Sequence, residues 1–173
     1  MKKTLVFGAS LKPNRYSNYA IQRLVANNFD TVAFGLKTGE IEGVNIDNEL
    51  KDYENVDTVT LYLNAKRQKE YYDYIIGLNP NRVIFNPGTE NPEFYQLLKE
   101  NNIDYFGDIS SGNVPYLIKE KNGIKFAIIG HNGFGGSKTE EVKKNIVELS
   151  DKVDFVIMYA HWGKEYNKMP SEI

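Results

Sequence analysis

Short apolar runs alternate with amphipathic segments over the first hundred residues. The runs have the length of β-strands and are rich in β-branched and aromatic residues, which is typical of parallel strands buried on both faces. They cover residues 4–7, 31–35, 57–63, 82–86 and 103–107. The segments between them have apolar residues at helical spacing and predict helices over residues 17–28, 65–78 and 91–102. Repeated β-α-β units predict an α/β fold with a right-handed, doubly wound parallel sheet.

The third predicted helix has the clearest start signal. Asn91 is expected at its N-cap, because a side-chain oxygen there accepts a free amide of the first turn. Pro92 follows at the first helical position. Proline is tolerated there because the backbone N–H that it lacks would have no partner within the helix.

The pattern changes after Gly107. Residues 113–132 contain two apolar runs joined at Asn122-Gly123, a pair typical of a two-residue β-hairpin turn. An amphipathic helix is predicted over residues 137–152 and a buried strand over residues 154–163. The order β-β-α-β departs from the alternation that precedes it.

We therefore predict two parts, residues 1–107 and residues 108–173. The second part is expected to add strands to the first sheet or to dock on it. Its apolar strands, Phe126–Ile129 and Phe155–Met158, would otherwise be exposed and would promote aggregation.

The turn after the first strand carries the first candidate chemistry. It lies where a parallel sheet opens its ligand crevice, and Gly8-Ala9-Ser10 would bring backbone amides near an anion at the start of the next helix. The dinucleotide fingerprint has two further glycines, which this turn lacks. In their place stand Lys12–Tyr16, a more basic loop in which Arg15 could clamp a diphosphate. A purely structural turn is the alternative.

The second strand ends without the acidic residue that a NAD site uses to hold the ribose hydroxyls. Gly35, Leu36 and Lys37 stand there instead. A lysine at this position suits a ribose that carries a phosphate, as in NADP or coenzyme A. An exposed loop lysine without a ligand is the alternative.

Two more strand ends converge on the same edge. Tyr62 and Asn64 end the third predicted strand, and Pro87 and Gly88 follow the fourth in a turn that allows a ligand close to the backbone. Taken alone, this second segment reads as a tight turn before a capped helix.

Composition narrows the function classes. The chain is 41% hydrophobic and 25% charged, with a net charge of −2, so neither nucleic acid nor an anionic membrane is expected as an obligatory partner. It has no cysteine, which excludes disulfides, thiolate metal sites and cysteine nucleophiles. Without a signal-peptide pattern or an apolar run of membrane length, we expect a soluble, cytoplasmic protein.

Taken together, "GASLKPNRYS", "GLKTGEIEGV", "DTVTLYL" and "RVIFNPGTENPE" resemble the CoA-binding domain family, Rossmann-like proteins similar to the nucleotide-binding domain of the succinyl-CoA synthetase α subunit. The resemblance covers about residues 2–105 and implies coenzyme A at the carboxyl edge of the sheet. The positions it implies are Gly8, Ala9, Ser10, Arg15, Tyr16, Lys37, Tyr62, Asn64, Pro87 and Gly88. The cysteine-containing segment that usually closes such domains is missing.

Residues 107–173 are similar to part of the poly-γ-glutamate capsule-biosynthesis proteins, relatives of the calcineurin-like metallophosphoesterases. His161 matches a metal ligand of that family, within "HWG", and His131 matches none. The family's other ligands are missing, so we expect neither a dinuclear metal site nor hydrolase activity. The two resemblances predict a chimera, whether engineered or natural.

No nucleophile–base pair accompanies the turn, where Ser10 and Tyr16 are the only candidates. We therefore predict a non-catalytic module that binds coenzyme A or a related phosphorylated nucleotide, with no catalytic residue. The alternatives are an NADP-dependent oxidoreductase and a chimera that retains neither parent activity. The sequence leaves the oligomeric state open.

Overall fold

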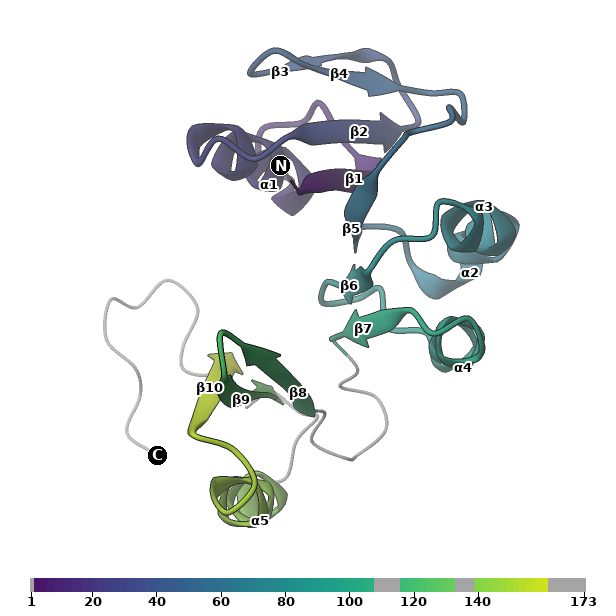
Figure 1. Ribbon diagram of the computed structural model, residues 1–173. Helices are drawn as coiled ribbons and strands as arrows, with labels where there is room; N and C mark the ends of the chain where they lie inside the picture. The colour runs from purple at the N-terminus through teal and green to yellow at the C-terminus, as the bar shows by residue number, and fades with distance from the viewer. Residues whose placement is uncertain (1, 108–115, 133–138, 162–173) are drawn as a thin grey trace. The chain divides into compact units, whose positions relative to one another are not determined.

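The computed structural model describes residues 2–107, 116–132 and 139–161 (Figure 1). The chain divides into two compact units, Met1–Phe106 and Gly107–Ile173, and each unit has its own β-sheet. The strands of the second unit form a sheet of their own. That the second unit packs on the first stays a prediction.

The first unit contains a seven-stranded sheet in the order β3-β4-β2-β1-β5-β6-β7. Neighbouring strands are parallel except for the antiparallel pair β3–β4. The strands are β1 (Lys3–Ala9), β2 (Thr31–Gly35), β3 (Gly39–Ile41), β4 (Val44–Asp47), β5 (Val56–Leu61), β6 (Arg82–Phe85) and β7 (Asp104–Phe106). The doubly wound α/β fold and all five predicted strands of this unit are confirmed.

The strand order reverses direction at β1. From β1 the chain moves outward to β2 on one side and returns to β5 on the other. In open α/β sheets, ligands bind outside the carboxyl ends of the strands at such a switch point. The loops after β1, β2, β5 and β6 all leave the sheet at this edge.

Helices cover both faces of the sheet, α1 (Tyr16–Ala26) on one and α3 (Tyr72–Gly77) and α4 (Pro92–Glu100) on the other (Figure 1). Successive side chains of β1 point to opposite faces of the sheet, and each face has its own hydrophobic core. Val6 packs with α1, whereas Leu5 and Phe7 join the larger aromatic core beneath α3 and α4. The predicted cap of α4 is confirmed, since Asn91 Oδ1 accepts the Phe94 amide at 3.3 Å.

The helix predicted over residues 65–78 is interrupted. It consists of α2 (Ala65–Gln68), a 3₁₀ turn at Lys69–Tyr71, and α3. The tighter turn directs two adjacent rings to different partners: Tyr71 meets the ring of Phe7 edge-on, and Tyr72 stacks on Phe94 with centroids 4.5 Å apart.

A β-hairpin that the sequence analysis did not predict follows β2. β3 and β4 pair antiparallel around a two-residue turn, and β4 then pairs parallel with β2. Ile41 and Ile46 are buried against α1, so the hairpin widens the core on that face.

The second unit has a three-stranded sheet in the order β10-β9-β8, formed by β8 (Tyr116–Lys121), β9 (Ile124–Asn132) and β10 (Phe155–His161). The predicted hairpin turn is confirmed, with φ of 54° at Asn122 and 78° at Gly123. Helix α5 (Thr139–Ser150) links the parallel strands β9 and β10 and packs Val142 and Leu149 against them. Across the described ranges of both units, we find no helix with the length and apolar character to cross a membrane.

Candidate functional site: the carboxyl edge of the first sheet

The end of β1 is shaped by Gly8, which has a φ of 95° and interrupts the register with β2. A Cβ atom on Gly8 would lie 3.0 Å from the carbonyl carbon of Tyr62 and 3.1 Å from the side chain of Leu63. The Tyr62 amide donates to the Phe7 carbonyl at 2.8 Å. The predicted residues Gly8 and Tyr62 are therefore in direct contact, and only glycine fits this position.

The loop after β1 is tied to the start of α1 by a buried side chain. Asn18 Nδ2 donates to the Ser10 carbonyl at 3.1 Å, and Asn18 Oδ1 accepts from Gln22 at 2.7 Å. The Arg15 amide donates to the Lys12 carbonyl at 3.1 Å, which closes the loop before the helix begins. Asn18 thus positions the loop after β1, a role that was not predicted from the sequence.

The N-terminus of α1 lacks electrostatic compensation. Arg15 occupies the N-cap position without a side-chain cap bond, and no acidic residue stands in the first turn. Free amides and the helix dipole give this end a partial positive charge. Arg15 and Tyr16 are exposed, Tyr16 by 79%. This end of the helix, on an edge where ligands bind, is suited to an anion.

The end of β2 approaches the loop after β1 very closely. A Cβ atom on Gly35 would lie 2.3 Å from the Ala9 carbonyl oxygen, so no larger residue fits without moving the backbone. Leu36 and Lys37 follow and are exposed. Lys37 is therefore on the loop that begins where Gly35 approaches Ala9.

The turn after β6 matches its sequence signature. The Thr89 amide donates to the Asn86 carbonyl at 2.9 Å, Pro87 takes the second position, and Gly88 has a φ of 87° in the third. This combination defines a type II turn. The Gly88 amide is not free, however, because it donates to Glu90 Oε2 at 2.8 Å.

Gln68 joins the loops after β5 and β6. Its side chain is fully buried, and its Nε2 donates to the carbonyls of Leu63 and Thr89, both at 2.7 Å. Its Oε1 accepts from Asn91 Nδ2 at 2.9 Å. The predicted residue Asn64 lies beside this link and caps α2 through the Arg67 amide at 3.2 Å. Gln68 therefore fixes the spacing of two loops at the candidate site.

Cations without carboxylate partners gather on these segments. In the described part of the chain, Lys12, Arg15 and Lys37 form neither an ion pair nor a side-chain hydrogen bond, and Lys66 and Arg67 of α2 form no ion pair. The five positive charges follow the carboxyl ends of β1, β2 and β5 in a protein whose net charge is −2. This local excess favours a ligand with several negative charges.

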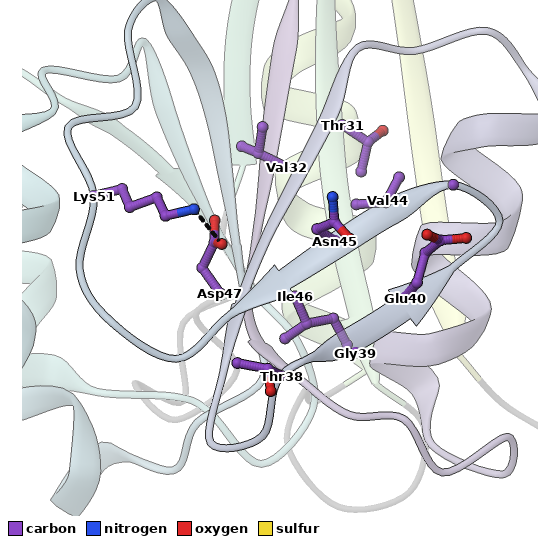
Figure 2. Close-up of a pocket in the computed structure, with 11 residues that line it drawn as sticks. Thr31, Val32, Thr38, Gly39, Glu40, Val44, Asn45, Ile46, Asp47 and Lys51 are labelled. Atoms are coloured by element: carbon purple, nitrogen blue, oxygen red, sulfur yellow. Dashed lines mark hydrogen bonds and ion pairs between the residues drawn. The ribbon is translucent and has the colours of Figure 1, made fainter.

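A separate hollow lies over the β3–β4 hairpin and β2, and it contains none of the predicted site residues (Figure 2). Asp47 bonds Lys51 and accepts from the Tyr53 hydroxyl at 2.8 Å. Burial acts to raise the pKa of Asp47, but the hydrogen bonds from Lys51 and Tyr53 outweigh it and hold the pKa below its usual value. The negative charge of Asp47 is thus already balanced by its ion pair with Lys51.

In the second unit, His161 is the residue that matches a metal ligand of the resembled family. Among the side chains that the structure describes, no three histidine, aspartate or glutamate residues lie close enough to share an ion. His131 is on β9, and the side chain of His161 lies outside the described residues. The expectation that this unit has no dinuclear site and no hydrolase activity stays a prediction.

The sequence profile of the CoA binding domain family matches residues 2–113. The chain belongs to this family. No curated protein matches it. The interpretation of residues 107–173 as a capsule-biosynthesis fragment, and of the chain as a chimera, gains no support from the matches.

Solved structures resemble this CoA binding domain. The crystal structure of an uncharacterized protein is 48% identical, with a TM-score of 0.60, over 62% of this chain and 90% of that protein. A hypothetical protein from Pyrococcus horikoshii OT3 is 25% identical, with a TM-score of 0.57, over 62% of this chain and 76% of its own. A conserved hypothetical protein from Pyrococcus furiosus, 22% identical over 61% of this chain and 91% of its own with a TM-score of 0.55, shares the fold.

Proposed function

We propose that the first unit binds coenzyme A, or a closely related phosphorylated nucleotide, at the carboxyl edge of its sheet and catalyses no reaction there. The observation that carries this proposal is the start of α1, where Arg15 occupies the N-cap position and makes no side-chain cap bond. Gly8, with its positive φ, lies near the end of the preceding strand. Membership of the CoA binding domain family supports the choice of ligand.

The order of the loops fits the order of groups in coenzyme A. A diphosphate at the start of α1 would meet free amides and the Arg15 guanidinium. A ribose phosphate would then reach Lys37 on the loop after β2. The uncharged pantetheine arm would run the other way, past Tyr62 towards the turn at Pro87 and Gly88.

The proposal of a non-catalytic module is supported by the environment of the two hydroxyl groups near the turn. Ser10 Oγ accepts from the Lys12 amide at 3.3 Å, and Tyr16 is largely exposed. A serine nucleophile needs a base within hydrogen-bond reach. The contacts of Ser10 in the structure include no such base.

Replacing Arg15 with alanine tests the proposal. We expect coenzyme A affinity to fall roughly tenfold to a hundredfold, because a charge-assisted bond of about 1.5–3 kcal/mol is lost. The measurement is calorimetric titration. Arg23→Ala is the matched control, since Arg23 is an exposed arginine in the last turn of the same helix. Equal affinity in the Arg15→Ala variant and the parent protein would reduce the loop to a structural turn.

Lys37→Ala separates the ribose phosphate from the rest of the ligand. We expect the variant to lose affinity for coenzyme A but to bind dephospho-coenzyme A as the parent does, because that ligand lacks the phosphate Lys37 would meet. Titration of both ligands into both proteins gives the comparison. If the variant loses the same affinity for both ligands, Lys37 contacts a part of the ligand other than the ribose phosphate. A parallel titration with NADP tests the alternative cofactor.

A further inference from the structure

The turn after β6 places a carboxylate at the candidate site. The Gly88 amide points at Glu90 and donates to its Oε2 at 2.8 Å. Gly88 is exposed, and a Cβ atom added to it would meet nothing within 4 Å. The Glu90 side chain, itself only partly buried, therefore accepts the amide of an exposed turn residue at the carboxyl edge of the sheet.

The charge of Glu90 is not balanced by a neighbouring cation. In the residues that the structure describes, its carboxylate forms no ion pair with lysine or arginine, whereas Glu93, three residues on, pairs with Lys69 at 2.7 Å. The Gly88 amide is the contact that holds it. The turn thus orients this carboxylate, which has no cationic partner among the described side chains.

The edge of the sheet is electrically polarised. Strands β2, β1, β5 and β6 lie side by side in this order, which spans roughly 14 Å at about 4.8 Å per strand. The segments after β2, β1 and β5 carry the five cations described above, and the loop after β6 carries Glu90. A ligand lying along this edge would meet positive charge at one end and negative charge at the other.

We propose that Glu90 determines ligand specificity: the site accepts coenzyme A and thioesters with uncharged acyl groups, and it disfavours acyl groups that end in a carboxylate. The inference rests on the proposed function. With its phosphates held at the cationic end, the ligand directs its thiol end to the loop after β6. An acyl carboxylate at that end would face the Glu90 carboxylate. Two negative charges close together repel each other, which would weaken binding.

The experiment compares acetyl-coenzyme A with succinyl-coenzyme A by calorimetric titration at low salt, where exposed charges are least screened. We expect the parent to prefer the acetyl ligand on the order of tenfold. Glu90→Gln should bring the two affinities close together by strengthening succinyl binding, because glutamine keeps an acceptor for the Gly88 amide and loses the charge. Glu93→Gln is the matched control and should keep the parent's preference.

Equal affinity of the parent for the two thioesters, or an unchanged preference in Glu90→Gln, would overturn the specificity role while leaving coenzyme A binding intact. Failure of coenzyme A and both thioesters to bind any of the three proteins would overturn the proposed function and this inference with it. A melting temperature of Glu90→Gln equal to that of the parent would show that the turn after β6 is retained.

Discussion

Replacing Gly35 with alanine is expected to destabilise the protein by about 3 kcal/mol, at the upper end of the usual range for overpacking a tight site. The added methyl group would lie 2.3 Å from the Ala9 carbonyl oxygen and 3.1 Å from the Ile46 side chain. Because the nearest atom belongs to the backbone, a rotamer change cannot relieve the clash. The strands β1 and β2 must separate where the loop after β1 begins.

Urea unfolding followed by circular dichroism measures this loss. Gly77→Ala is the control, because Gly77 ends α3 and a Cβ atom there would have no neighbour within 4 Å. Alanine is also the better helix former, so this variant should unfold at the parent's midpoint or slightly above it. Similar midpoints for Gly35→Ala and Gly77→Ala would show that the close approach of Gly35 to Ala9 does not constrain the fold.

Replacing Gln68 with leucine is expected to cost about 3 kcal/mol as well. The variant leaves the carbonyls of Leu63 and Thr89 without their donor and Asn91 without one acceptor, in a buried or partly buried environment. Each unsatisfied buried group costs about 1–3 kcal/mol, whereas the leucine itself would gain little because the site is already closed to water.

The control is Gln96→Leu, the same chemical change at an exposed position of α4 whose amide bonds only the Glu100 carboxylate. Its midpoint in urea should differ little from the parent's. If Gln68→Leu unfolds at the same urea concentration as Gln96→Leu, the bridge between the loops after β5 and β6 contributes nothing measurable.

The parts of the fold predicted well have strong local signals. The strand at residues 82–86 is apolar and β-branched, and Asn91-Pro92 marks the start of α4 without ambiguity. The turn residues Pro87 and Gly88 were identified for the same reason, since their allowed backbone angles select one turn type.

The β3–β4 hairpin was missed because its signals are weak. Its strands have three and four residues, too few to show an alternation, and Glu42 adopts a φ of 48° that a glutamate rarely takes. Pairing with β2 and burial of Ile41 and Ile46 outweigh that local preference. Tertiary contacts of this kind cannot be read from a single short segment.

The residues that position the site were missed for a related reason. Gln68 and Asn18 look like ordinary polar helix residues in the sequence, because their partners, Leu63, Thr89 and Ser10, are backbone carbonyls of loops. Backbone acceptors leave no trace in the identity of the residues that carry them. Glu90 was likewise hidden, since its bond to the Gly88 amide depends on the geometry of the turn.

A titration of the ¹⁵N-labelled protein with coenzyme A, followed by amide chemical shifts, tests directly whether the carboxyl edge of the sheet binds this ligand. We expect saturable shifts at Gly8, Ser10 and Tyr16, with further shifts at Lys37 and Gly88. Amides of the hollow in Figure 2, such as those of Asn45 and Glu40, should move little. No saturable shift at millimolar coenzyme A, or shifts confined to that hollow, would contradict the proposal that the carboxyl edge of the sheet binds the ligand.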